Sequence, residues 1–395
     1  TPELIASAFA HSSAPLKLAL YAGAFTFRVR TVFLALSTCS IPLLYVAVLR
    51  FRKNAWEAAL SAALLATSFE LAYHARWIAP DTIMVTFASL SLCALASSSS
   101  SQRWYWLAVV AAGLATSSKY TAGLMLVPCV LALWQQTDAI VDAIERRRAR
   151  VRRLWGTLAV FAVVYLAITP GTIIEAPRFL WDVTRQAEIY GDAGHKGYTP
   201  GGHVAYVVDV VRYFALVFFS PFIPIAVALF ALVFVGARRA FLDDRRNTIV
   251  LASFAVVFLG FFATQKTLIV RNFLVVAPTI AMFAAIGASS LVSIVRKRRR
   301  ALAYVVAAVI AIVVAVDAAF LVYAGETVHD RRSSRFMTDF GAYLDRHAGE
   351  SIVVAPKLKS ALAAFEHRNR DGLVDVPTSS TTKIAGYAHE LLPRE

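Results

Sequence analysis

A small set of charged residues in this 395-residue chain has the types needed to bind a phosphate-linked group and transfer part of it. Arg76, Lys119, Lys266 and Arg271 each stand in a connection between apolar segments that carries few other charges. Lysine and arginine neutralise a phosphate, and arginine adds two parallel hydrogen bonds. Asp81 supplies a carboxylate that could accept a proton from a hydroxyl group. These residue types fit the binding of an anionic group with proton transfer beside it.

Simpler roles are open for the same residues. Asp81 follows Pro80 at an expected helix start, where a carboxylate complements the helix dipole by about 0.3–1 kcal/mol. Arg76 and Lys119 could extend along apolar surface to lipid phosphates. His195 stands in a glycine-rich stretch and could be either solvated or in reach of a substrate. None of the residue spacings typical of a metal site occurs, so we expect no metal.

The elements that must position these residues are long apolar segments, and a membrane crossing needs about 20 apolar residues. Basic residues gather in alternate connections between the segments. The basic connections contain Arg50 to Lys53, Arg103, Arg146 to Arg153, Arg238 to Arg246, and Arg296 to Arg300. Lysine and arginine are retained on the cytoplasmic side of a membrane. The pattern therefore predicts an all-α polytopic membrane protein with the candidate residues on the extracytoplasmic side.

Composition agrees with this class. The chain is 58% hydrophobic and 16% charged, with a net charge of +15. In a soluble protein such a charge would suggest nucleic acid, but here the excess lies in the cytoplasmic connections, where it can contact anionic lipid. We therefore expect membrane lipids and no nucleic acid as partners. Cys39, Cys93 and Cys129 all fall in apolar segments, which favours packing over disulfide or metal chemistry.

We expect about ten crossings within residues 31–324, with both ends of the chain outside. The stretch from Trp104 to Trp134 is long for one crossing, and a single crossing would place Arg146 to Arg153 outside. Two short helices that meet at Ser117 to Lys119 keep this cluster inside. Residues 170–204 form a long outer loop with an amphipathic piece from Phe179 to Tyr190.

Two further segments complete the expected organisation. Residues 1–30 correspond to a remnant of a first extracytoplasmic loop. Residues 325–395 are expected to form a small extracytoplasmic α/β segment. Its expected elements are a helix at Ser333 to His347, a strand at Ser351 to Ala355, and a second helix from Pro356.

The order of the motifs resembles the membrane glycosyltransferases of the GT-C superfamily, glycosyltransferase family 39 in particular. It is similar to the bacterial branch that includes protein O-mannosyltransferases and aminoarabinose transferases. The most specific match is GLATSSKYTAG, a short-hairpin motif at residues 113–123. The other matches are HSSAPL at 11–16, RWIAPD at 76–81, the loop around Thr169 to Gly171, KTLIVRNFLVVAP at 266–278, and Asp330-Arg331.

The resemblance implies inverting transfer of a sugar from a polyprenyl phosphate donor to a lipid, glycan or protein acceptor. The reaction would take place on the outer face of a bacterial inner membrane, without a metal or other cofactor. In this scheme Asp81 is a candidate catalytic residue. The residues that would bind the donor phosphate or substrate are Arg76, Lys119, Tyr120, His195, Lys266 and Arg271.

One departure from the family is clear. Its members carry their principal catalytic aspartate in the first outer loop, whereas the only acid before the first crossing here is Glu3. We expect the missing aspartate to belong to a segment before Thr1. The alternative class is a transporter or lipid flippase with a polar outer cavity, which inverted repeats would support. No such repeat is found in the sequence.

Overall fold

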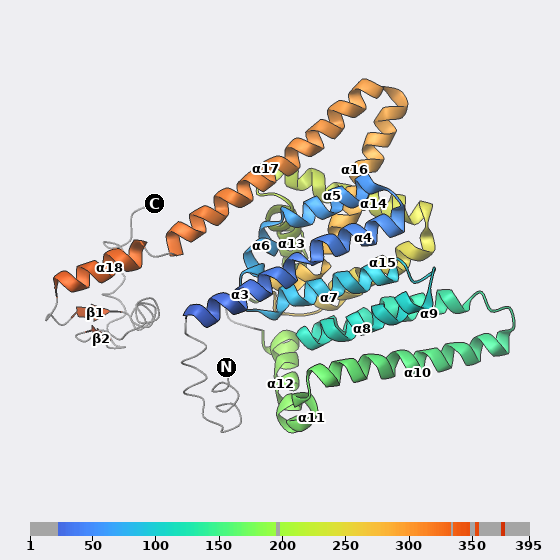
Figure 1. The fold of residues 1–395 in the computed structure, drawn as a ribbon, viewed down its shortest axis with the longest axis horizontal. Coiled ribbons are helices and arrows are strands. Elements are labelled where there is room, and N and C mark those ends of the chain that lie inside the picture. The colour runs from blue at the N-terminus through green and yellow to red at the C-terminus, as the bar shows by residue number, and fades with distance from the viewer. Residues whose placement is uncertain (1–22, 195–197, 333–334, 348–351, 355–372, 376–395) are drawn as a thin grey trace. The chain divides into compact units, whose positions relative to one another are not determined.

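The computed structural model describes residues 23–194, 198–332, 335–347, 352–354 and 373–375 (Figure 1). Within these residues the chain is helical apart from two strands of three residues each. The chain divides into two compact units, Val29–Leu321 and a second that joins Thr1–Arg28 with Val322–Glu395. The first unit contains all the candidate site residues named above.

Six helical segments in the described residues are long and apolar enough to cross a membrane. They are Phe27–Arg52 (α3, Gly23–Thr38, with α4, Ser40–Arg52), α10 (Ala143–Ile168), α14 (Ile223–Asp243), α15 (Arg245–Ala263), Val270–Arg298 (η4, Val270–Val276, with α16, Ala277–Arg298), and Arg300–Gly325 within α17 (Arg300–Arg332). A bent pair, α6 (Phe69–Ala75) with α7 (Pro80–Leu95), raises the number to seven. The polytopic helical class is confirmed, and the figure of ten crossings stays a prediction.

The remaining expected crossings consist of shorter helices. They are α5 (Ala55–Ala66), α8 (Gln102–Ser118), η1 (Tyr120–Met125) and α9 (Leu126–Thr137). As expected, α8 ends where the two short helices were predicted to meet, and Lys119 after it has an extended backbone with φ −157° and ψ 123°. Between α5 and α6, the Ser68 hydroxyl accepts a hydrogen bond from the Leu71 amide and so caps α6. Broken helices at membrane depth must be covered by protein or line a wet cavity.

The long outer loop is also largely helical. It contains α11 (Gly171–Ile174), α12 (Ala176–Glu188) and the π-turn η2 (Ile189–Ala193), and is followed by α13 (His203–Arg212) and η3 (Tyr213–Phe219). The predicted amphipathic piece falls mostly within α12. The apolar stretch from Tyr206 to Val235, expected as one crossing, is interrupted at Ser220, whose backbone is extended. Pro221 directly follows, and a residue before proline is restricted to extended conformations.

The core of the first unit surrounds α16, where all twelve residues from Ala277 to Ala288 are buried. Helix α14 crosses it with backbone nearly touching backbone. A Cβ atom added at Gly236 would lie 1.8 Å from the Phe283 carbonyl oxygen, and one at Gly287 would lie 2.0 Å from that of Leu232. Close backbone approach at small residues is how membrane helices gain packing contacts that lipid cannot replace.

The second unit is described only in part. Helix α18 (Arg335–Arg346) lies within the expected helix, and β1 (Ile352–Val354) lies within the expected strand. Strand β1 pairs in parallel with β2 (Leu373–Asp375), with Ile352 opposite Leu373. The helix expected from Pro356 and the expected loop remnant up to residue 22 lie outside the described residues.

The glycine contact between α14 and α16 generates a stability prediction. Gly236→Ala and Gly287→Ala should each lower the melting temperature, because the new methyl group forces the two backbones apart and overpacking costs about 1–3 kcal/mol or more. Gly260→Ala in α15 is the matched control, since a Cβ there meets nothing within 4 Å. Equal melting temperatures for all three variants in detergent would contradict the close packing.

Candidate functional site

Asp81 occupies the first turn of α7, directly after the 118° bend that separates this helix from α6. Pro80 begins the helix, where the fixed backbone angle of proline suits the first position. The Asp81 side chain is only 2% exposed and is therefore shielded from solvent. A carboxylate buried to this degree requires compensating charge or hydrogen bonds.

Lys119 supplies that compensation from the break between α8 and η1. Its Nζ atom donates to Asp81 Oδ1 at 2.7 Å and to Asn272 Oδ1 at 2.6 Å. The Lys119 side chain is 20% exposed, so the ion pair is largely shielded from water. An ammonium group has three hydrogens, and these two contacts use two of them.

Arg271 and Asn272 reach the same point from η4, the short helix that leads into α16. Arg271 Nε lies 4.0 Å from Asp81 Oδ2, and no hydrogen-bond acceptor is present for this buried atom among the described residues. The side chain as a whole is 43% exposed. Asn272 Nδ2 donates to the Tyr190 hydroxyl at 2.9 Å. We call these four residues together with Lys119 the Asp81 cluster.

The outer loop is fastened to this cluster through backbone bonds. The Lys266 amide donates to the Tyr190 carbonyl at 2.7 Å, and the Leu268 amide donates to the Tyr198 carbonyl at 2.7 Å. The Thr267 hydroxyl donates to the Ile189 carbonyl at 2.8 Å. Burial raises the pKa of the Tyr190 phenol above its ordinary value, so the hydroxyl keeps its proton at neutral pH. Tyr190 can therefore accept from Asn272 and still donate to a bound group.

A second buried pair lies on α6, before the bend. Glu70 and His74 stand one helical turn apart, and His74 Nε2 lies 2.9 Å from Glu70 Oε1. Both side chains are 7% exposed, and His74 Nδ1 has no partner within the described part of the chain. This contact matches the packing pair that the four-residue spacing indicates.

The structure brings together some of the predicted site residues and separates others. Asp81, Lys119 and Arg271 are neighbours in the cluster, whereas the Arg76 guanidinium lies 4.7 Å from the centre of the Tyr73 ring. Tyr120 is 48% exposed, and the Lys266 side chain is also exposed. His195 lies outside the described residues. No group of three or more potential metal-ligating side chains occurs within the described ranges.

Sequence reasoning missed Asn272 and Tyr190 as site residues. Asn272 directly follows Arg271 in the matched stretch KTLIVRNFLVVAP, and that position was the available signal. Tyr190 lies 82 positions from Asn272 and gives no signal of its own.

The cluster is suited to hold an anion. Lys119 has one ammonium hydrogen left, and the partly exposed Arg271 guanidinium has donors to spare. Both oxygens of Asp81 face cations and are shielded from solvent, which suits a role in holding Lys119 and Arg271 in place. This geometry does not present the carboxylate to a substrate hydroxyl.

Comparisons with known proteins agree on the class of fold. The sequence model of the dolichyl-phosphate-mannose-protein mannosyltransferase family matches residues 16–173, a segment that contains Arg76, Asp81 and Lys119. The fold is similar to the crystal structure of ArnT from Cupriavidus metallidurans bound to undecaprenyl phosphate, with 16% identity, a TM-score of 0.50, and coverage of 92% of this chain and 74% of ArnT.

The apo structure of the same ArnT gives 15% identity and a TM-score of 0.53, with coverage of 91% of this chain and 73% of ArnT. None of the curated protein sequences matches significantly. The resemblance to the GT-C membrane glycosyltransferases is thus confirmed, in sequence over residues 16–173 and in fold over most of the chain.

A double-mutant cycle tests the buried pair. Asp81→Asn or Lys119→Met alone should destabilise the protein by about 3–5 kcal/mol, because each leaves an uncompensated buried charge. The double variant should lose less than the sum of the two, measured by unfolding in detergent. The exposed pair Glu175–Arg178, at 3.5 Å, is the control and should show almost no coupling. Additive effects at Asp81 and Lys119 would disprove the pairing.

Proposed function

We propose that the protein is a membrane glycosyltransferase that moves a sugar from a polyprenyl phosphate to an acceptor hydroxyl with inversion. The acceptor oxygen attacks the anomeric carbon, the bond from that carbon to the phosphate oxygen breaks, and the prenyl phosphate leaves. The GT-C fold, the family match over residues 16–173, and the undecaprenyl phosphate bound to the structurally similar ArnT all support this class.

The observation that carries the proposal is the arrangement of Lys119 and Arg271 on either side of Asp81. The two cations have unused hydrogen-bond donors that could contact one phosphate group. Negative charge develops on that phosphate as the sugar leaves, and donors fixed in advance stabilise such charge without reorganising. Tyr190, held by Asn272, could add a neutral donor to the same group.

In this proposal Asp81 is a positioning residue and not the general base. Its two oxygens are engaged with Lys119 and close to Arg271, so proton acceptance from the acceptor falls to a different group. Arg76 stacks on Tyr73 and makes no hydrogen bond or ion pair that links it to the cluster among the described residues, so we assign it no phosphate contact.

We further propose that the cluster lies on the outer side of the membrane. Helix α16 begins beside Arg271 and ends at Arg298, and its 22 residues correspond to a length of about 33 Å. That length spans a hydrocarbon core of about 30 Å. The end of α16 carries Arg296, Lys297 and Arg298, and such basic residues favour the cytoplasmic side. The opposite end, with the cluster, would then face outward.

Binding of undecaprenyl phosphate to purified variants tests the proposal. Arg271→Ala should weaken binding by about tenfold to about a hundredfold, the cost of removing one charged hydrogen-bond donor. Arg271 is the better choice than Lys119 because it is partly exposed and its loss leaves the Asp81–Lys119 pair intact. Arg178→Ala is the control, since Arg178 lies in α12 and its side chain is 77% exposed. Equal affinities of the two variants would reject the phosphate site.

A further inference from the structure

A polar pocket lies at the opposite end of α16 from the Asp81 cluster. Its volume is about 1070 Å³, and residues from the start of α5 and from α14, α16 and the start of α17 line it. On α16, its lining residues run from Ser289 to Lys297. Arg296 is 19 residues beyond Ala277, which corresponds to about 28 Å along the helix. The pocket is therefore separate from the proposed donor site.

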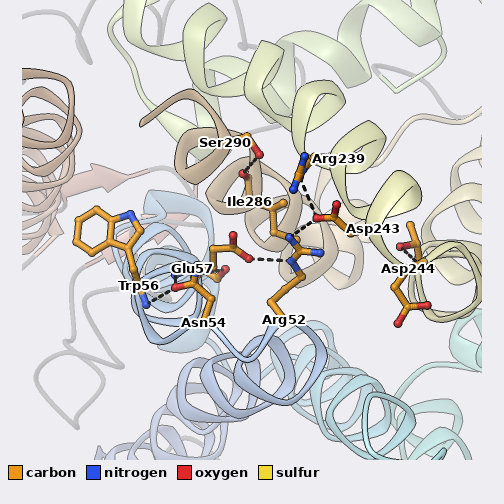
Figure 2. Close-up of polar contacts among 11 residues, drawn as sticks. Arg52, Asn54, Trp56, Glu57, Arg239, Asp243, Asp244, Ile286 and Ser290 are labelled. Atoms are coloured by element: carbon orange, nitrogen blue, oxygen red, sulfur yellow. Dashed lines mark hydrogen bonds and ion pairs between the residues drawn. The ribbon is translucent and has the colours of Figure 1, made fainter. Parts of the chain in front are cut away.

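One wall of the pocket is a fixed network of paired charges (Figure 2). Arg52 Nε lies 2.9 Å from Glu57 Oε2, and Arg52 Nη2 lies 2.8 Å from Asp243 Oδ2. Arg239 Nε reaches the same Asp243 oxygen at 2.9 Å. The Asn54 side chain caps α5 beside this network by accepting from the Trp56 and Glu57 amides. The carboxylates of Glu57 and Asp243 neutralise Arg52 and Arg239. This wall of the pocket therefore offers little net charge to a ligand.

The opposite wall carries cations with no such balance. Arg296 and Lys297 lie in the last turn of α16, and Arg300 is the first residue of α17. All three line the pocket, and no carboxylate in the described part of the chain forms an ion pair with any of them. The extended residue Arg299, with φ −148°, separates the two helices, so the cations approach the pocket from two directions.

The rest of the lining combines small hydroxyl groups with apolar surface. Ser289, Ser290 and Ser293 present hydroxyls on α16. The apolar lining residues include Val292, Ile294, Ala303 and Ala307, with the aromatic rings of Trp56, 43% exposed, and Tyr304, 78% exposed.

We infer that this pocket binds an anionic phospholipid. The headgroup phosphate would contact Arg296, Lys297 and Arg300, and an acyl chain would follow the apolar side of α16 and α17. A free phosphate fits the cations equally well but leaves the adjoining apolar surface without a partner. Basic residues at a membrane surface attract anionic lipid by roughly 1 kcal/mol each, and a pocket adds a defined position for the lipid. The inference does not depend on the proposed reaction.

Native mass spectrometry of the detergent-solubilised full chain, titrated with dioleoyl phosphatidylglycerol, tests this site. The wild-type protein should retain one such lipid much more strongly than dioleoyl phosphatidylcholine. The variant Arg296→Gln/Lys297→Gln/Arg300→Gln should lose affinity for it by about a hundredfold. The control Arg147→Gln/Arg148→Gln/Arg152→Gln removes three exposed charges from α10 that do not line this pocket. The loss of lipid affinity in this control should be at least about tenfold smaller than in the variant of Arg296, Lys297 and Arg300.

A second variant keeps every charge. Ser293→Phe inserts a bulky ring into the pocket and should also weaken retention of the lipid, which a purely diffuse attraction would not do. Equal losses in the two triple variants, or unchanged lipid retention in Ser293→Phe, would overturn the inference. Displacement of the lipid by glycerol phosphate at equal concentration would also overturn it, because the apolar surface would then contribute nothing.

Discussion

The ion pair between Asp81 and Lys119 is the interaction on which the arrangement of the Asp81 cluster depends. A charge buried among membrane helices is costly unless another charge or hydrogen bond compensates it. Lys119 can reach Asp81 because α8 stops at Ser118, and Asp81 can be reached because the chain bends before α7. Asn272 joins the pair through its side-chain oxygen and so fixes the short helix η4 and its neighbour Arg271. The helix breaks and the polar cluster therefore require each other.

The two ends of α16 show contrasting uses of positive charge. At the beginning of the helix, the buried Asp81 carboxylate pairs with Lys119 and lies 4.0 Å from Arg271. At its end, the carboxylates of Glu57 and Asp243 engage Arg52 and Arg239 (Figure 2). Within the described residues no carboxylate pairs with Arg296, Lys297 or Arg300. The glycine contact between α14 and α16 gives both ends a common rigid support.

The sequence predicts the class of fold well, because hydrophobic length and the alternation of basic residues depend only on the membrane. It also singles out Asp81, Lys119 and Arg271 as candidates, since charges are scarce in the connections that hold them, and the structure brings these three residues together. Their pairing is not predictable, because Asp81 and Lys119 are 38 positions apart and Lys119 and Asn272 are 153 apart. The number of crossings is also not predictable from the sequence, because it depends on where helices break. The helices break at polar residues such as Ser68 and Ser220, within apolar stretches that appear continuous in the sequence. Tertiary contacts determine the positions of these breaks.

The central claim is that Asp81 positions Lys119 and Arg271 to bind the phosphate of a prenyl-linked donor. A cryo-electron microscopy structure of the protein in lipid nanodiscs with undecaprenyl phosphate tests it most directly. We predict phosphate density within about 3 Å of both Lys119 Nζ and the Arg271 guanidinium, the usual length of charged hydrogen bonds, with the Asp81–Lys119 pair intact. Phosphate density that contacts neither cation, while the lipid is otherwise well ordered, would contradict the account.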